Sequence, residues 1–308
     1  MDTAREPASR ASVLGRPVPA ALLAPLRPSA AVAGDVSALP AALARDGYLY
    51  LRGLLPAAAV LAARQAILAR LEAVDEVAAP ATAAIATGRS RRRELHADLG
   101  RFWRSVSEEP ALRRLTHGPE LATLGAALFD KPVRAQDYLF LRCAGRGKAT
   151  GVHCDSPFFT RLTKRVVTCW CALGPVPLED GPLFVLEGSH EAADLAARVD
   201  GFDVARDKDR KATLAEDAIT LAEQRGCRLL SADFAPGDVV VFGMLTYHGA
   251  FDNASPLGRV RVSCDVRLQP AADPLDPRYF GVEPLGTTGA GYGELNAAKP
   301  IPEDWHVR

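Results

Sequence analysis

Hydrophobic and polar positions alternate along the second half of this 308-residue chain, as they do in half-buried β-strands. In the run from Val133 to Cys143, Gln136, Tyr138 and Phe140 fall on one face and the intervening residues on the other. Glycine and proline turns separate further short strands, expected at residues 166–173, 183–186, 227–231, 238–248 and 259–268. The pattern predicts a mainly β fold with flanking helices: a double-stranded β-helix, that is, a cupin-like jelly roll.

Helical periodicity dominates the first half of the chain. Helices are expected at residues 39–45, 56–74 and within 92–130, with one strand at 48–55. Residues 1–38 are rich in proline and alanine and are interpreted as an N-terminal arm. Residues 39–270 then form the jelly-roll domain, with a helical insert at 191–225, and residues 271–308 form an irregular C-terminal extension.

Composition narrows the class of protein. The chain has 37 basic and 37 acidic residues, so it lacks the basic excess of a general nucleic-acid binder. Its six cysteines form no Cys-x-x-Cys motif, and no apolar run reaches membrane-spanning length. We expect a cytoplasmic protein with neither nucleic acid nor membrane as a partner. The oligomeric state is left open.

The chemistry is concentrated in residues 151–159, which read Gly-Val-His-Cys-Asp-Ser-Pro-Phe-Phe. On an extended strand His153 and Asp155 would project from the same face, with Cys154 facing away. A third ligand would have to come from another strand, and His248 ends the apolar run 238–248. Two histidines and one carboxylate make the facial triad of non-haem Fe(II) oxygenases, which leaves three metal positions open.

An iron centre of this kind needs electrons to activate O2, and one large class of enzymes takes them from 2-oxoglutarate. The far carboxylate of that co-substrate needs a buried cation, for which arginine is well suited. Arg259, Arg261 and Ser263 share one face of the strand expected at 259–268. Both arginines could instead point to solvent.

At this point the sequence resembles the phytanoyl-CoA dioxygenase-like family of Fe(II)/2-oxoglutarate oxygenases. The resemblance covers roughly residues 40–270. It rests on His153-x-Asp155, His248 after 95 residues and Arg259 after a further 11. Four supporting segments match in order: the tryptophan-containing strand 168–173, the Asp-Gly turn at 179–183, the Gly-Ser-His turn at 187–190 and Pro-Gly-Asp at 236–238. Glu187 stands where the family usually has proline, which affects a turn and not the triad.

The resemblance implies roles for individual residues. Iron would be bound by His153, Asp155 and His248. Arg259 would pair with 2-oxoglutarate beside Ser263, with Arg261 as the fallback. The family also contacts its co-substrate at the positions of Gln136 and Trp170.

The resemblance further implies a dioxygenase that hydroxylates, or otherwise oxidises, an unactivated C–H bond with Fe(II), 2-oxoglutarate and O2. Asp155 occupies the position that halogenases of this type leave free for chloride, which favours hydroxylation, desaturation or ring formation. Possible substrate contacts are Phe158, Phe159, Arg161 and Arg165, which suit a specialised metabolite or an acyl or carboxylate compound. Two alternatives stay open: a cupin-type metal enzyme that uses no 2-oxoglutarate, and a non-catalytic binding protein on the same fold.

Overall fold

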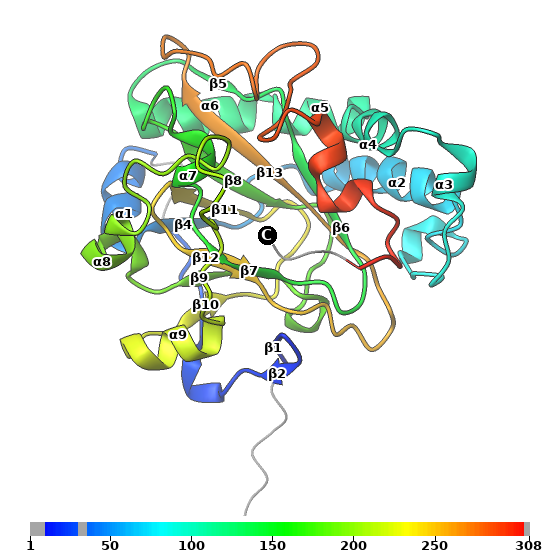
Figure 1. Ribbon diagram of the computed structural model, residues 1–308, viewed down its shortest axis with the longest axis horizontal. Coiled ribbons are helices and arrows are strands. Elements are labelled where there is room, and N and C mark those ends of the chain that lie inside the picture. The colour runs from blue at the N-terminus through cyan, green and yellow to red at the C-terminus, as the bar shows by residue number, and fades with distance from the viewer. Residues whose placement is uncertain (1–9, 30–35, 305–308) are drawn as a thin grey trace, which may run out of the picture.

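The computed structural model describes residues 10–29 and 36–304. Residues 1–9 and 30–35 of the expected arm, and residues 305–308 of the expected extension, lie outside the described residues. The described chain forms two main β-sheets flanked by helices, shown in Figure 1, which confirms the predicted jelly roll.

The larger sheet has six strands in the order β4-β11-β8-β13-β5, with β6 also paired to β13. Its strands are β4 (Tyr48–Leu51), β5 (Val133–Ala135), β6 (Phe140–Ala144), β8 (Val167–Ala172), β11 (Val239–Gly243) and β13 (Arg261–Pro270). The single strand expected at 133–143 is therefore wrong in detail. The backbone N–H of Tyr138 bonds to the carbonyl of Tyr279 instead of a strand partner, which divides the run into β5 and β6.

The smaller sheet has five strands in the order β3-β10-β9-β12-β7. They are β3 (Leu23–Pro25), β7 (Thr150–His153), β9 (Leu183–Leu186), β10 (Leu229–Ser231) and β12 (His248–Ala250). The run expected as one strand at 238–248 is two strands in different sheets, because the chain crosses over at residues 244–247. β3 comes from the expected N-terminal arm and pairs in parallel with β10, so this part of residues 1–38 is integrated into the sheet. A short hairpin of β1 (Ser12–Val13) and β2 (Arg16–Pro17) precedes it.

Strand alternation explains how the layers pack. In β9, Leu183 and Val185 join the apolar cluster that also holds Tyr48, Trp170 and Phe242 of the larger sheet. The other β9 side chains belong to a second cluster on the outer side of the smaller sheet, with residues of α8 (Ala193–Ala197) and α9 (Ala218–Arg225). A period of two therefore supplies an apolar face to the inter-sheet space and another to the covering helices.

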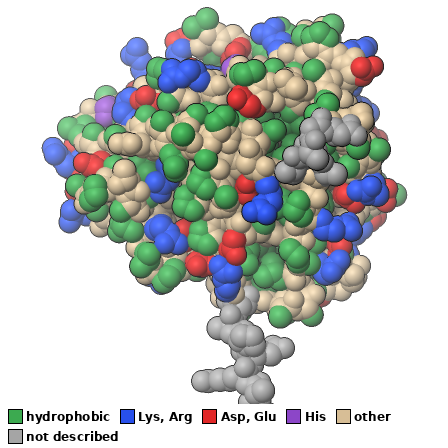
Figure 2. All heavy atoms as spheres, turned by 180° about the vertical axis from the view of Figure 1, so that it is seen from behind, with side chains coloured by type: hydrophobic (Ala, Val, Ile, Leu, Met, Phe, Trp, Pro, Cys, Tyr) green, Lys and Arg blue, Asp and Glu red, His purple; other side chains and the backbone are tan. Residues whose placement is uncertain are grey.

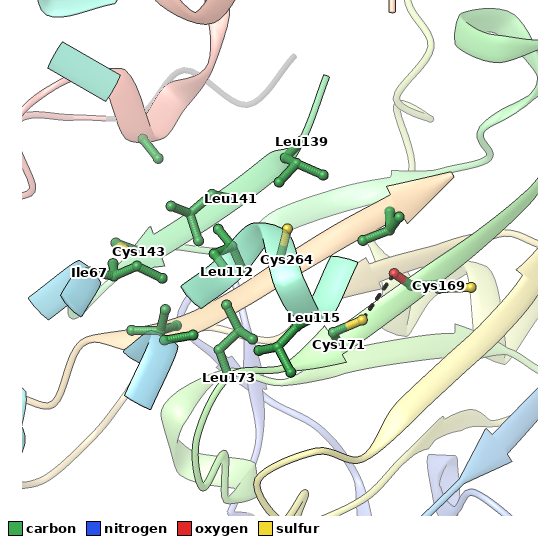
Figure 3. Packing of buried hydrophobic residues seen from close by; sticks show 14 of the residues in the cluster. Ile67, Leu112, Leu115, Leu139, Leu141, Cys143, Cys169, Cys171, Leu173 and Cys264 are labelled. Atoms are coloured by element: carbon green, nitrogen blue, oxygen red, sulfur yellow. Dashed lines mark hydrogen bonds between the residues drawn. The ribbon is translucent and has the colours of Figure 1, made fainter. Parts of the chain in front are cut away.

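Helices cover the outer face of the larger sheet. They are α1 (Leu39–Asp46), α2 (Ala57–Glu72), α3 (Arg92–Leu95), α4 (Leu99–Ser107), α5 (Pro110–Thr116) and α6 (Pro119–Phe129). Four cysteines of the sheet (Cys143, Cys169, Cys171 and Cys264) lie in the same buried cluster as leucines of α5, as Figure 3 shows. All six cysteines are free thiols.

The C-terminal segment packs on this helical layer through two short 3-10 helices, Gly291–Glu294 and Asn296–Ala298, which lie against α4 and β6 (Figure 1). Tyr292 stacks on Tyr138 with ring centroids 4.5 Å apart. Figure 2 shows acidic and basic side chains interspersed on the rear face of the molecule, with no large region of one sign on that face. No helix within the described ranges is long and apolar enough to cross a bilayer.

Candidate metal centre

The three candidate ligands meet at one end of the inter-sheet space. β7 and β12 are antiparallel neighbours, and His153 and His248 are direct partners in their ladder. Asp155 follows β7 and is not on a strand as expected: its φ of −83° and ψ of −12° are helical, and it begins α7 (Ser156–Phe159). The turn into α7 therefore brings the carboxylate toward the two imidazoles, while Cys154 packs into the outer apolar cluster of the smaller sheet.

The geometry of the three residues suits one metal ion. One ligand atom from each of His153, Asp155 and His248 lies within 4.8 Å of the others. The Nδ1 atom of His153 lies 2.9 Å from the carbonyl of Gly151, and that of His248 lies 3.0 Å from the carbonyl of Thr246. A carbonyl only accepts, so each Nδ1 carries the proton and each Nε2 keeps its lone pair for a metal.

The protonation states of the three residues favour binding of a cation. Burial, together with the neighbouring His248, lowers the pKa of His153 to about 3, and burial also lowers the pKa of His248. Burial alone would raise the pKa of Asp155, but Arg267 and the two histidines outweigh it and hold that pKa below its usual range. At neutral pH the site therefore presents two neutral imidazoles and one carboxylate.

The inner face of β13 is unusually polar. Alternation places Arg261, Ser263, Asp265 and Arg267 on one face, while the residues between them join the apolar core. Arg267 lies at the triad, with Nη2 3.1 Å from Oδ2 of Asp155. Asp265 accepts a hydrogen bond from Nε of Arg142 at 3.1 Å.

Arg261 and Ser263 lie nearer the start of the same strand and have side-chain atoms without hydrogen-bond partners among the described residues. Arg261 is 2 % exposed, and burial, reinforced by nearby Arg142, lowers its pKa to about 10. Within residues 10–29 and 36–304, neither Nε of Arg261 nor Oγ of Ser263 has a hydrogen-bond partner. Buried donors without partners are rare and costly, so this pair suits an anionic ligand.

Arg259 has a different environment from the one expected. Its Nε and Nη2 donate to the two carboxylate oxygens of Asp180, at 2.7 and 3.1 Å. Its backbone bridges to Ile85 ahead of β13, so it does not belong to the polar face that begins with Arg261. A saturated bidentate pair leaves Arg259 little capacity to bind another carboxylate.

The two remaining co-substrate candidates differ in their surroundings. Gln136 is buried next to the polar strand, its backbone N–H bonds to the carbonyl of Arg267, and its Oε1 has no partner among the described residues. Trp170 lies in the inter-sheet apolar cluster, with its ring 4.7 Å from that of Phe234, and its position in the ladder is opposite Asp265.

A cavity of about 1100 Å³ lies beside the triad. Its walls include Ser156 and Pro157, which follow Asp155, and residues 243–246, which lead into His248. None of the three candidate ligands is among its lining residues. Further parts of the wall come from α1, from residues 160–164 after α7, from His190 and from residues 196–206 of the helical insert. Figure 1 shows α1 and α8 on the same side of the molecule as α7.

The four substrate candidates occupy different positions. The ring of Phe158 lies 6.3 Å from that of His153, whereas Phe159 is buried against Tyr279. Arg161 lines the cavity but is held by both carboxylate oxygens of Asp203, each at 2.7 Å. Arg165 pairs with Asp273 and does not line the cavity.

The arginine-rich segment 89–93 is also internally paired. Arg89 bonds to Asp75, Arg91 to Glu94 and Arg93 to Glu303. Arg92 is fully buried against Glu76. These pairs make the segment a structural cluster and leave its arginines little capacity to bind an anionic substrate.

The sequence reasoning missed Arg267, Thr168 and Arg142. Each contacts a charged group near the triad: Thr168 and Arg267 contact Asp155, and Arg142 contacts Asp265. A signal for Arg267 was present, because a residue six positions after Arg261 on an alternating strand falls on the same face. Its partner Asp155 could not be read from that spacing.

The family model for phytanoyl-CoA dioxygenase matches residues 43–260 of this chain. The chain therefore belongs to the phytanoyl-CoA dioxygenase family, as the order of its motifs predicted. Family membership and the His-Asp-His cluster together make it an oxygenase of the iron- and 2-oxoglutarate-dependent class. No curated protein sequence matches the chain.

Three solved structures illustrate the shared fold. The epimerase SnoN from nogalamycin biosynthesis, in complex with Fe3+, alpha ketoglutarate and nogalamycin RO, is 21 % identical with a TM-score of 0.53, over 88 % of this chain and 94 % of that one. The carbocyclase SnoK, also from nogalamycin biosynthesis, is 24 % identical with a TM-score of 0.51, over 84 % and 91 %. EctD from S. alaskensis, with 2-oxoglutarate and 5-hydroxyectoine, is 22 % identical with a TM-score of 0.51, over 80 % of each chain. At these identities the likeness concerns the fold.

Proposed function

We propose that this protein oxidises an unactivated C–H bond of a small molecule, using Fe(II) bound by His153, Asp155 and His248. When bound, iron with 2-oxoglutarate and O2 supplies the oxidising power for a two-electron oxidation. The observation that carries the proposal is the buried cluster of two neutral imidazoles and one carboxylate. Three protein ligands leave the remaining metal positions for the co-substrate and oxygen.

The far carboxylate of 2-oxoglutarate is assigned to Arg261 and Ser263 in place of Arg259. The support is the contrast between the two arginines: Arg259 is saturated by Asp180, whereas Arg261 and Ser263 are buried with unpartnered polar atoms. A dicarboxylate bound to Arg261 would also neutralise the buried positive charge of Arg261, which is repelled by the nearby positive charge of Arg142. Gln136, with its free Oε1 beside β13, stays a candidate contact, and so does Trp170 opposite Asp265.

The cavity beside the triad is the proposed substrate site. Its volume of about 1100 Å³ is at the upper end of the usual range for small-molecule pockets, so it admits a multi-ring compound. Apolar side chains on its wall include Leu43, Pro157, Phe202 and Met244, and polar ones include Ser156 and Thr160. Because Arg161 is already paired with Asp203, Lys164 is the cation on this wall that has no ion pair within the described part of the chain. A largely apolar body with one anionic group fits this lining.

Anaerobic titration tests the assignment. Fe(II) and 2-oxoglutarate added to the apoprotein should produce the weak visible charge-transfer band of the chelate. Arg261→Met should weaken 2-oxoglutarate binding at least tenfold, whereas Arg259→Met should weaken it much less.

Three other outcomes would contradict this scheme. Iron binding without a band would favour a metal enzyme that uses no 2-oxoglutarate, and no iron binding would favour a binding protein. Loss of the band in Arg259→Met alone would restore the role first expected for Arg259.

The type of oxidation is tested separately by product mass. Hydroxylation adds an oxygen atom to the substrate, and ring formation or desaturation removes two hydrogen atoms. Epimerisation, the chemistry named for SnoN, leaves the mass unchanged. We propose hydroxylation, desaturation or ring formation, since Asp155 occupies the metal position that a halide would need; an unchanged mass, or a mass increased by a halogen atom, with consumption of 2-oxoglutarate would overturn this choice.

A further inference from the structure

Arg267 occupies an unusual position between two aromatic rings. Its guanidinium carbon lies 4.2 Å from the ring centroid of Phe140 and 4.3 Å from that of Phe159. The side chain is 3 % exposed, and its Nη2 is shared between Asp155 at 3.1 Å and Asp265 at 3.8 Å. The two rings restrict the planar group to one slot, so its contact with Asp155 is directed by packing as well as by charge.

The two carboxylate oxygens of Asp155 are not equivalent. Oδ2 accepts hydrogen bonds from both Thr168 Oγ1 and Arg267 Nη2. Oδ1 lies 3.9 Å from Nε2 of His153 and accepts no hydrogen bond from any residue in the described ranges. One oxygen is therefore held by the protein, and the other faces the imidazoles.

We infer that Arg267 is a positioning residue that makes Asp155 a one-oxygen metal ligand. This inference rests on the proposed function, because it takes His153, Asp155 and His248 as metal ligands. A carboxylate that binds through both oxygens would occupy a second metal position. By retaining Oδ2, Arg267 keeps that position open for the chelating co-substrate or for oxygen.

A purely structural arginine in this protein looks different. Arg92 is also fully buried, with its guanidinium carbon 4.9 Å from the ring centroid of Phe102 and 5.2 Å from that of Trp103. Its two terminal nitrogens are both paired: Nη1 donates to three backbone carbonyls of residues 297–299, and Nη2 donates to Glu76, while Nε has no partner among the described residues. In Arg267, Nη1 as well as Nε has no partner among residues 10–29 and 36–304. Only Nη2 makes a hydrogen bond within these residues, and its acceptor is the carboxylate of the candidate ligand.

The test compares Arg267→Met and Arg267→Lys with Arg92→Met, the matched control for loss of a buried arginine between aromatic rings. Methionine keeps the apolar stem in the slot and removes every donor, whereas lysine keeps the charge. Co(II) is titrated into each metal-free protein without 2-oxoglutarate, and both the affinity and the visible ligand-field spectrum are recorded. Circular dichroism and thermal unfolding check that each variant is folded.

The expected result for Arg267→Met is a 10- to 100-fold weaker affinity for Co(II), the range for loss of an outer partner of a metal ligand. Its spectrum should also change with the coordination of Asp155, and Arg267→Lys should recover part of both effects. Arg92→Met should lose stability but keep the wild-type affinity and spectrum.

The inference is overturned if Arg267→Met binds Co(II) with wild-type affinity and spectrum, or if Arg92→Met shifts both equally. Because this arm contains no 2-oxoglutarate, it is independent of whether the wild type forms the chelate band. If the wild type forms no charge-transfer band but Arg267→Met still changes the Co(II) affinity and spectrum, 2-oxoglutarate is not the co-substrate and the positioning role of Arg267 is retained.

Discussion

Arg259 and Asp180 form a bidentate ion pair in which the carboxylate is almost fully buried, with 3 % of its side chain exposed. Arg261, two residues further along, is 2 % exposed and has no carboxylate partner in the part of the chain that the structure describes. Two arginines that look interchangeable in the sequence therefore differ in what they contribute to stability.

This difference predicts that replacement by methionine has opposite effects on stability at the two positions. Arg259→Met leaves the buried Asp180 charge without its partner and should lower the free energy of unfolding by about 3 kcal/mol. Arg261→Met removes a buried, unpaired cation and should leave the stability of the cofactor-free protein unchanged or raise it. Urea unfolding of both variants checks the prediction, and Arg93→Met, which breaks an exposed pair with Glu303, should stay within about 0.5 kcal/mol of wild type. A large loss of stability in Arg261→Met would contradict it.

The metal-free protein should lose stability as the pH falls below about 6.5. The pKa of His153 is lowered to about 3 in the folded state by burial and by His248, while the unfolded chain has an ordinary histidine pKa of about 6.5. Between these values the unfolded state binds more protons, so acidification favours unfolding. From pH 7 to pH 5 the loss due to His153 is about 2 kcal/mol, and His248 acts in the same direction.

Urea unfolding at the two pH values measures this loss. His153→Gln should make the dependence shallower, whereas saturation with metal should not, because the folded-state imidazole is already neutral between these two pH values. A wild-type slope that is unchanged in His153→Gln would assign the effect to other groups.

Thiol chemistry should be confined to one position in the native protein. Cys143, Cys154, Cys169, Cys171 and Cys264 are buried, and burial raises the pKa of Cys143, Cys154 and Cys169 to about 12. Only Cys227 is partly exposed. A thiol reagent should therefore label at most one cysteine rapidly in the native state and all six in urea. Cys227→Ser should abolish the rapid phase; rapid labelling of several thiols would mean that the core opens easily.

The C-terminal segment should be essential to the fold. Glu294 accepts hydrogen bonds from the backbone of Thr287 and Thr288, both at 2.6 Å, from the Thr288 hydroxyl at 2.7 Å and from Tyr138. Glu294→Ala leaves these groups unpaired and should cost about 2–4 kcal/mol in unfolding free energy. Glu283→Ala, in the same segment but 78 % exposed, should cost less than about 0.5 kcal/mol. Equal effects of the two substitutions in urea unfolding would show that the segment is not an integral part of the fold.

Local patterns in the chain were sufficient for several conclusions. The alternation of β13 and the turns around it predicted the jelly roll, because burial of one face of a strand repeats every second residue. The order of the histidine, aspartate and arginine motifs predicted the family, which the family match confirms. The pairing of His153 with His248 follows from the same sheet, since strands distant in sequence become neighbours in it.

Other features depended on contacts between residues far apart in the sequence. The expected arm and extension proved to contain β3 of the smaller sheet and Tyr279, whose hydroxyl bonds to the carbonyl of Phe158 beside the triad. Asp155 reaches the imidazoles through a helical turn and not along a strand. The partners of Arg259, Arg261 and Arg267 had no sequence signal, because an ion pair depends on where two side chains meet in space. Spacing along the chain identified the two histidines and the aspartate that cluster in the structure. Only the packing of the two sheets decided which of the arginines on and before β13 pairs with Asp180, which has no ion pair among the described residues and which contacts Asp155.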